Sequence, residues 1–265
     1  MNISHFKKRR KRPVTADELI ARLESEPAWV ARQENWRVEQ RKRIEEYERD
    51  AKDLVSDLAA AGFQVTAVSD LYNFGYAYRP VIPILLRWLP RINNLRVKEG
   101  IVRALTDGAA KPLAAPLLIE EFRTVTCPKG VTEVQLAHYK ASVANGLSVV
   151  ADDLVFEEIV DLIQDRRHGW SRAPLAIALQ RMKNPAATDI LMGVLDEDPD
   201  LNDPGPALIV DTIRALGNRK VSKARTKIER FLDHTSPIVR KEAQKSLDKI
   251  ERAEQKTREK PLKKG

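Results

Sequence analysis

Four histidines and one cysteine are the residue types in this chain best suited to metal binding or nucleophilic chemistry. The histidines are His5, His138, His168 and His234, and none has the His-x-x-x-His spacing that would place two rings on one helix face. Cys127 is the only cysteine, so neither an internal disulfide nor a zinc site built from cysteines can form. In the stretch TCPKG we expect this thiol to lie in a turn, as an incidental loop residue without a partner base. The sequence therefore predicts no metal site and no cofactor.

Adjacent carboxylates and glycine motifs give no stronger sign of an enzyme. Asp152-Asp153 and Glu157-Glu158 fall on an amphipathic helical pattern but lack convergent partner ligands, which favours a solvated helix face. No Walker A loop, no GxGxxG and no GxSxG occurs. We therefore expect a protein that is not an enzyme, although the sequence leaves that question open.

The composition predicts an all-α protein. Hydrophobic residues make up 43% and charged residues 32% of the 265 residues, which fits a soluble folded chain. Glycines number only 11, good helix formers dominate, and no stretch alternates with period two. No apolar run reaches the roughly 18–20 residues that a membrane span requires. A basic N-terminus without a following apolar segment argues against secretion, and together with the lone cysteine it favours the cytoplasm.

A sequence pattern typical of a helix recurs along the chain and indicates an array of helix pairs. Five stretches fit one frame: 95–105, 137–147, 172–182, 206–216 and 237–247. A second apolar helical stretch precedes each of them: 80–89, 112–122, 154–164, 185–195 and 221–232. The last apolar positions of the frame recur every 31 to 42 residues, at Leu105, Leu147, Met182, Leu216 and Leu247. A drifting period in this range is typical of helical repeats, whose pairs bury their apolar faces by stacking on one another.

The repeated residues carry a resemblance to a known superfamily. Arg103-Ala104-Leu105, the stretch Arg214 to Asn218, and Ser236 to Arg240 followed by Ala243 and Leu247 are similar to HEAT repeats, in particular the short bacterial repeats of the phycobilisome-lyase type. The resemblance covers residues 79–251 and implies a right-handed α-solenoid of about five helix pairs. Because the superfamily consists mostly of scaffolds, it also implies a binding role rather than an activity.

Two HEAT-type enzymes give specific tests of that implication. Deoxyhypusine hydroxylase uses His-Glu pairs for its iron, and this chain contains none, which excludes that activity. The alkylpurine DNA glycosylases place a Trp and an Asp on a concave wall beside basic residues. Trp170 and Asp211 are the one such pair that the alignment sets on neighbouring second helices. A HEAT-like alkylpurine DNA glycosylase acting on damaged DNA is therefore the alternative function, and it requires both side chains to be exposed on one wall.

The ends of the chain differ from the array. We expect residues 1–14 to be a basic disordered tail, 15–78 a helical cap, 79–252 the array, and 253–265 a second basic disordered tail. The net charge of +8 comes from these ends, because residues 13–248 sum to −2. The N-terminal cations could serve as a polyanion or nucleic-acid site, or simply solvate the tail. These residues are Lys7, Lys8, Arg9, Arg10, Lys11 and Arg12.

Two further patterns in the cap leave alternatives open. Ile44, Tyr47, Ala51, Leu54 and Leu58 form a short seam that fits a docked cap, or alternatively a dimerisation helix. Residues 63–79 hold five aromatic side chains, which would seal the junction between cap and array, or alternatively form a stacking platform.

The aligned second helices also predict a binding surface. The position two before the last apolar residue lies about 200° around the helix from the core, so it should face solvent. Five polar residues occupy this column: Arg103, Asn145, Gln180, Arg214 and Lys245. Because three are cationic and none is acidic, the column predicts a recognition strip for an acidic or polar partner. We therefore expect a scaffold that binds another protein through the concave face of its second helices, with nucleic acid as a further partner of the tails.

Overall fold

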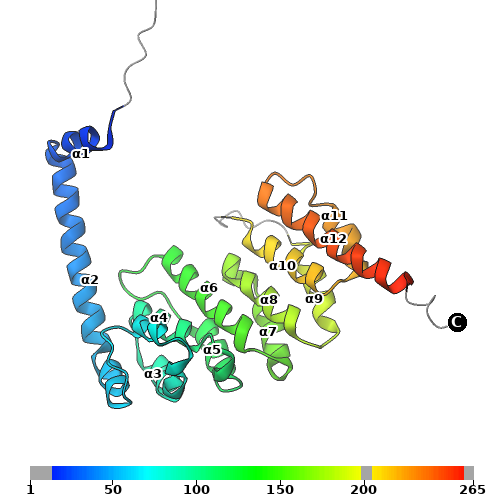
Figure 1. Ribbon diagram of the computed structural model, residues 1–265, viewed down its shortest axis with the longest axis horizontal. Helices are drawn as coiled ribbons and strands as arrows, with labels where there is room; N and C mark the ends of the chain where they lie inside the picture. The colour runs from blue at the N-terminus through cyan, green and yellow to red at the C-terminus, as the bar shows by residue number, and fades with distance from the viewer. Residues whose placement is uncertain (1–13, 198–204, 260–265) are drawn as a thin grey trace, which may run out of the picture. The chain divides into compact units, whose positions relative to one another are not determined.

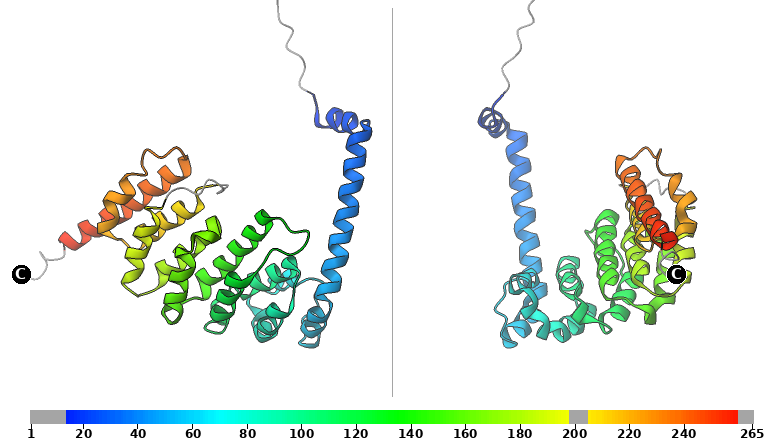
Figure 2. Two further views of the ribbon diagram at one scale, coloured as in Figure 1. Left: turned by 180° about the vertical axis from the view of Figure 1, so that it is seen from behind. Right: turned by 45° about the vertical axis from the view of Figure 1, so that its right-hand side comes forward.

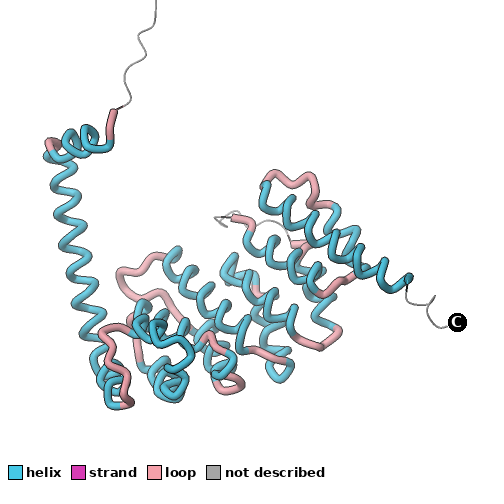
Figure 3. Tube along the Cα trace, viewed as in Figure 1, coloured by secondary structure: helices cyan, strands magenta, loops and turns pink. Residues whose placement is uncertain are grey.

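The structure is a computed structural model that describes residues 14–197 and 205–259. All regular elements in these two ranges are helices, and no strand occurs in them, which confirms the all-α prediction (Figure 3). No helix within the described ranges combines the length and apolar character needed to cross a bilayer. The chain divides into two compact units, Met1–Arg49 and Asp50–Gly265. The predicted N-terminal tail, apart from Val14, lies outside the described residues.

The first unit contains α1, Ala16–Glu24, and the beginning of α2, Pro27–Ala60. The predicted capping box opens α1, because Thr15 Oγ1 accepts from the Glu18 amide at 3.2 Å and the Glu18 carboxylate accepts from the Thr15 amide at 3.1 Å. No described residue of this unit is buried. The buried residues of α2 are Ala51, Leu54 and Leu58, all in the second unit. The predicted cap, residues 15–78, is thus divided at residue 49, because only the last part of its seam enters a core.

The second unit consists of helix pairs that follow one another in chain order (Figure 1). The first helices of the pairs are α3 Ile82–Trp88, α5 Ala114–Thr124, α7 Phe156–Gln164, α9 Ala186–Val194 and α11 Arg225–Glu229. The second helices are α4 Leu95–Leu105, α6 Glu133–Val150, α8 Ala173–Arg181, α10 Ala207–Asn218 and α12 Pro237–Glu259. Each second helix packs against its own first helix and against the second helices before and after it (Figure 2). The five predicted pairs therefore correspond to five observed pairs.

Segments of 3-10 helix lie in several of the connections between these helices. They are η1 Val68–Val81, η2 Leu89–Arg91, η3 Gly108–Ala110, η4 Asp153–Val155, η5 Arg166–Arg172 and η6 Ser222–Ala224. The last helix is longer than expected, since the predicted C-terminal tail begins at residue 253 whereas α12 continues to Glu259. The added part of the helix, residues 253–259, is held by the Glu254 carboxylate, which accepts from Arg225 Nη2 at 2.8 Å. Residues 260–265 lie outside the described residues.

The aromatic segment of residues 63–79 packs onto α4. Tyr78 is buried and its hydroxyl donates to the Ala104 carbonyl at 2.8 Å, while the Tyr72 hydroxyl donates to the Gly100 carbonyl at 3.1 Å. Phe63 and Phe74 meet edge to face with ring centroids 5.3 Å apart. These contacts favour the sealing interpretation over a stacking platform, because most of the rings are engaged with the protein itself.

Small residues allow the second helices to approach closely. Ala104, Ala215 and Ser246 are fully buried. A Cβ added at Gly217 on α10 would lie 2.8 Å from the Ser246 Cα on α12, and closer still to that serine's side chain. The absence of a side chain at Gly217 therefore sets the distance between these two helices.

A buried polar cluster joins the first two complete pairs. The Lys98 ammonium lies 2.7 and 2.6 Å from the two carboxylate oxygens of Glu121, and the Tyr139 hydroxyl donates to the same carboxylate at 2.9 Å. Burial and the neighbouring Glu121 charge raise the pKa of Tyr139 well above its ordinary range, so this hydroxyl remains a donor. The cluster ties α4, α5 and α6 into one register, since a shift of any of them would leave a buried charge unpaired.

We expect Gly217→Ala to lower the free energy of unfolding by about 1–3 kcal/mol, because the new methyl group overlaps Ser246. Gly193→Ala is the matched control, since a Cβ at this position in α9 meets nothing within 4 Å. There the gain in helix propensity should raise stability by up to about 1 kcal/mol. Urea unfolding of both variants measures the difference, and equal stabilities would contradict the close packing of α10 on α12.

Candidate binding surface on the second helices

The predicted column of polar residues lies on the exposed side of the second helices. Arg103, Asn145 and Lys245 are exposed, and Gln180 and Arg214 are half-buried. The next residue in each of α4, α6, α10 and α12 is buried, which shows that the column faces away from the core. Whether the column binds a partner stays a prediction.

Hydrogen bonds connect one member of this column, Gln180, to residues on the next two second helices. The Gln180 side-chain oxygen on α8 accepts from the Asn218 amide group on α10 at 2.8 Å. The Asn218 oxygen in turn accepts from the Lys249 ammonium on α12 at 2.6 Å. Asn218 and Lys249 each lie one turn beyond a predicted member, four residues after Arg214 and Lys245. The sequence analysis did not include these two residues, because it considered one position in each helix. Residues four apart on a helix lie on the same face, so their spacing could have identified them. We call the five predicted residues with these two the second-helix strip.

The two arginines of the strip form ion pairs with carboxylates that lie outside the aligned column. Arg103 Nη2 lies 2.8 Å from Glu99 Oε1, one turn earlier on α4. Arg214 lies 2.5 Å from Asp211 Oδ1 and 3.5 Å from Glu242 Oε1. The expectation of a cationic surface is therefore corrected for α4 and α10, where the charges balance. Lys245 has no ion pair with any residue in the described part of the chain.

The two carboxylates around Arg214 are held in unusual surroundings. Burial raises the pKa of Asp211, and the nearby Glu242 charge acts in the same direction, against the lowering effect of Arg214. Glu242 is buried, and its Oε1 has no hydrogen bond beyond the 3.5 Å ion contact with Arg214. One guanidinium thus compensates two partly buried carboxylates, so we expect its removal to leave both without a counter-charge.

Arginines at the ends of the second helices fix the spacing of the strip. Arg219, which follows α10, donates to the carbonyls of Leu179 at 3.1 Å and Met182 at 2.6 Å at the end of α8. Arg181 at the end of α8 donates in the same way to the Ser148 carbonyl of α6. Carbonyls at a helix C-terminus lack partners within their own helix and carry partial negative charge, so each guanidinium satisfies one helix while anchoring the next.

Trp170 and Asp211, the pair required by the glycosylase alternative, have different partners. Trp170 in η5 is half-buried, and its ring packs edge to face on His138 with centroids 4.9 Å apart. Asp211 is engaged by Arg214, as described above. No described contact brings these two side chains together, and the glycosylase function stays a prediction without support from their arrangement.

The remaining candidate residues of the sequence have structural roles or lie apart. His5 lies outside the described residues, and His234 Nδ1 accepts from the Ser236 amide at 3.0 Å. The Cys127 thiol donates to the Val131 carbonyl at 3.1 Å, and its pKa is raised by partial burial and by Glu133, which fits an unreactive loop cysteine. Among the described residues, no group of three or more His, Cys, Asp or Glu could hold a metal ion.

Asp153 is exposed, as expected, but its carboxylate also has specific backbone partners. Its carboxylate accepts from the backbone amides of Lys183 and Asn184, each at 2.9 Å. These two bonds join η4, at the start of one pair, to the chain that enters the next pair. The sequence showed only neighbouring acids, because the amides that bind Asp153 lie 30 residues away.

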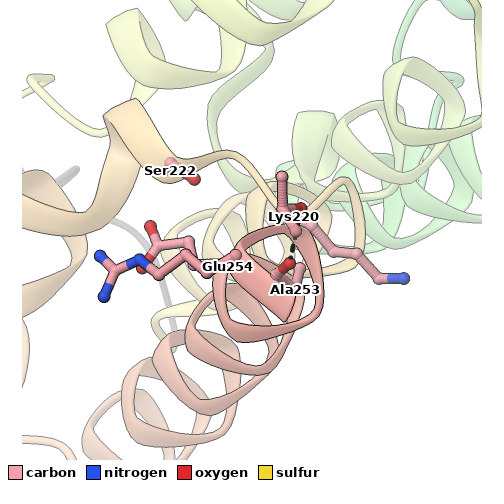
Figure 4. A pocket seen from close by; sticks show the side chains of 6 residues that line it. Lys220, Ser222, Ala253 and Glu254 are labelled. Atoms are coloured by element: carbon pink, nitrogen blue, oxygen red, sulfur yellow. Dashed lines mark hydrogen bonds between the residues drawn. The ribbon is translucent and has the colours of Figure 1, made fainter. Parts of the chain in front are cut away.

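A hollow lies at the C-terminal end of the last helix pair (Figure 4). It lies between η6 and the end of α12 and is lined by Lys220, Ser222, Ala253, Glu254, Thr257 and Arg258. Two of these side chains are already engaged, Glu254 with Arg225 and Thr257 with the Ala253 carbonyl at 2.9 Å. The polar lining differs from the mostly apolar lining of small-molecule sites, so the second-helix strip remains the better candidate.

His168 in η5 packs against Lys140 of α6 and Phe122 of α5. Its Nδ1 lies 3.1 Å from the Lys140 ammonium and its ring lies against Phe122, with centroids 4.7 Å apart. Burial lowers the pKa of His168 to about 4, the Lys140 cation acts in the same direction, and Asp165 opposes them. The neutral ring therefore accepts a hydrogen bond from Lys140 at neutral pH.

We expect stability to fall as pH drops from 6.5 towards 4, because unfolded histidine binds a proton in this window and folded His168 does not. The contribution between pH 7 and 5 should be on the order of 2 kcal/mol, and His168→Gln should remove it. His138→Gln, at an exposed histidine on α6, is the control and should keep the wild-type pH dependence. Urea unfolding at both pH values measures the effect, and parallel losses in wild type and His168→Gln would contradict it.

Comparison with models of known protein families finds none that matches this chain, and no curated protein matches it significantly. No function is thus transferred from a relative. The functional conclusion rests on the geometry of the second-helix strip, the bonds that join its members and the charges that balance it.

Proposed function

We propose that the protein is a non-enzymatic scaffold of the HEAT-like type, and that it binds a partner protein through its second helices. The five pairs would form a right-handed α-solenoid with the second helices on its concave face. The succession of pairs in chain order supports this arrangement, as does the packing of each second helix on its neighbours. The cytoplasm is the proposed compartment, on the evidence of the lone Cys127.

The observation that carries the proposal is the chain of hydrogen bonds from Gln180 through Asn218 to Lys249. Three helices present side chains that are accessible at their surface yet already held in place by one another. A partner that binds them meets groups whose rotamers are largely fixed, so less conformational entropy is lost on association. The arginines at the helix ends add to this effect by holding the helices at constant spacing.

The balanced charge of the strip favours a protein partner. Arg103 and Arg214 are each matched by carboxylates on the same face, so the strip offers donors and acceptors of both signs rather than a uniform field. Such mixed polar surfaces confer specificity by complementarity with another mixed surface, whereas a phosphate backbone requires uniform positive charge.

The test adds two carboxylates to the strip and compares them with two on the first helices. Asn145→Glu with Gln180→Glu places them on α6 and α8, and Thr124→Glu with Gln164→Glu places them on α5 and α7 of the same two pairs. Gln180 is partly exposed and the other three positions are exposed, so both double variants should fold. A partner captured by the wild type and identified by mass spectrometry should bind the strip variant at least about tenfold more weakly, since like charges and desolvated carboxylates oppose docking.

The control variant should retain the affinity of the wild type for that partner within about twofold, because rim and distant charges contribute little. Titration of the purified partner against all three proteins measures the result. Equal losses in both variants, or a loss in the first-helix variant alone, would move the binding surface away from the second helices.

A further inference from the structure

The last helix carries a line of cations along one face. Five basic residues recur at spacings of three or four, which keeps them within an arc of about 80° around the helix axis. They are Lys241, Lys245, Lys249, Arg252 and Lys256. At about 1.5 Å per residue the line is about 22 Å long. We call these five residues the basic face of α12.

Most of these cations have no counter-charge, although carboxylates lie nearby on the same helix. Asp248 accepts from Gln244 at 2.9 Å, Glu251 from Gln255 at 3.4 Å, and Glu254 from Arg225 at 2.8 Å. Each acid is thus hydrogen-bonded to a residue outside the basic face, and only Glu254 has a cationic partner. Within the described ranges, no ion pair is formed by Lys241, Lys245, Arg252 or Lys256. This arrangement contrasts with α4 and α10, where Arg103 and Arg214 are matched by acids one turn away.

The fifth cation, Lys249, is partly buried. Burial is the main reason that its pKa is lowered, the Lys245 and Arg214 cations act in the same direction, and Glu242 opposes them. A bound anion would offset the repulsion between Lys249 and Lys245, which lie one turn apart.

The residue types of this face discriminate among polyanionic ligands. Protein interfaces are depleted in lysine and enriched in aromatic residues, and membrane-surface helices place large apolar side chains beside their cations. Single-stranded nucleic acids are bound by stacking their bases on aromatic rings. The described part of α12 has one exposed large apolar residue, Ile238, and its sequence contains no aromatic residue. Lysines without stacking partners suit a phosphate backbone whose bases are paired.

We propose that the basic face of α12 binds the phosphate backbone of double-stranded nucleic acid without reading its sequence. About 22 Å of helix spans about six base pairs at 3.4 Å each, enough phosphates on one strand to engage all four unpaired cations. This inference goes beyond the scaffold function, because it gives the last pair a ligand of a different class from the partner of the strip. The two surfaces share Lys245 and Lys249. The inference is also independent of the N-terminal cations, which lie outside the described residues.

The experiment measures binding of the full-length protein to a labelled 20-base-pair duplex of arbitrary sequence by fluorescence anisotropy, between 50 and 200 mM salt. The basic-face variant combines Lys241→Gln, Lys245→Gln, Arg252→Gln and Lys256→Gln. Each phosphate contact contributes about 0.9 to the slope of log K against log salt, so the variant should lose about 3.6 from that slope. Its affinity at the lowest salt should fall at least about tenfold.

A matched control removes the same charge from other surfaces. Lys52→Gln, Lys111→Gln, Arg123→Gln and Lys129→Gln lie at exposed positions on α2, after η3, on α5 and before α6. This variant should retain the wild-type affinity within about twofold and the same salt slope, because only net charge has changed. Equal losses in the two variants would reduce the effect to net charge and overturn the proposal.

Further arms decide between sources of the binding. A variant with residues 7–12 replaced by glutamine should keep the salt slope of the basic face, and a loss confined to that variant would place binding in the N-terminal cations instead.

DNA and RNA duplexes should bind equally well, since both present phosphates. Tighter binding to a single strand, or to vesicles of anionic lipid in place of duplex, would contradict the proposal. A double variant, Lys241→Gln with Arg252→Gln, should lose about half of the slope change and guards against a folding defect in the fourfold variant.

Discussion

The close approach of successive second helices is the constraint on which the rest of the second unit depends. At Gly217 the backbone of α10 comes so near to Ser246 that no side chain fits between them. At that distance α10 and α12 bury residues against each other, and their exposed side chains lie on the side that faces away from this contact. The strip occupies this face, and the bonds from Gln180 to Asn218 and from Asn218 to Lys249 can form only because the helices lie so near.

Polar groups inside the helix layers then select one register among those that close packing permits. Arg172 is 3% exposed, donates to the Ile163 carbonyl at 2.6 Å and pairs with Glu197 at 2.7 Å. The Lys98–Glu121–Tyr139 cluster has the same character two pairs earlier in the chain. Apolar helix faces tolerate a slide of one turn, whereas a buried charge that loses its partner costs about 3–5 kcal/mol. Such groups therefore specify the stacking that the small residues allow, and with it the positions of the strip residues.

Much of this architecture could be predicted from the spacing of residues along the chain, because each helix pair is formed by residues that are close together in the sequence. The recurring frame placed all five second helices. The position two before the last apolar residue of each frame correctly placed Arg103, Asn145 and Lys245 on the exposed side. What the sequence could not give were the pairings made across space. Asp153 bonds to amides 30 residues away, and the division at residue 49 depends on which part of one continuous helix finds a core. The extension of α12 likewise depends on Arg225, which lies 29 residues before Glu254 in the chain.

Pairings that the sequence does not show also explain why the exposed faces of α4 and α10 differ in charge from that of α12. On α4 and α10, an acid three or four residues before the arginine folds back onto it, and the field of the cation is largely cancelled at short range. On α12, acids at comparable spacings bond to Gln244, Gln255 and Arg225, so no carboxylate forms an ion pair with the neighbouring lysines, although Asp248 and Glu251 keep their negative charge. Charge spacing along a helix therefore identifies a candidate face but does not fix its potential. The potential depends on which partner each carboxylate takes, and here those partners pair the arginines of α4 and α10 but form no ion pair with Lys241, Lys245, Arg252 or Lys256 of α12 in the described part of the chain.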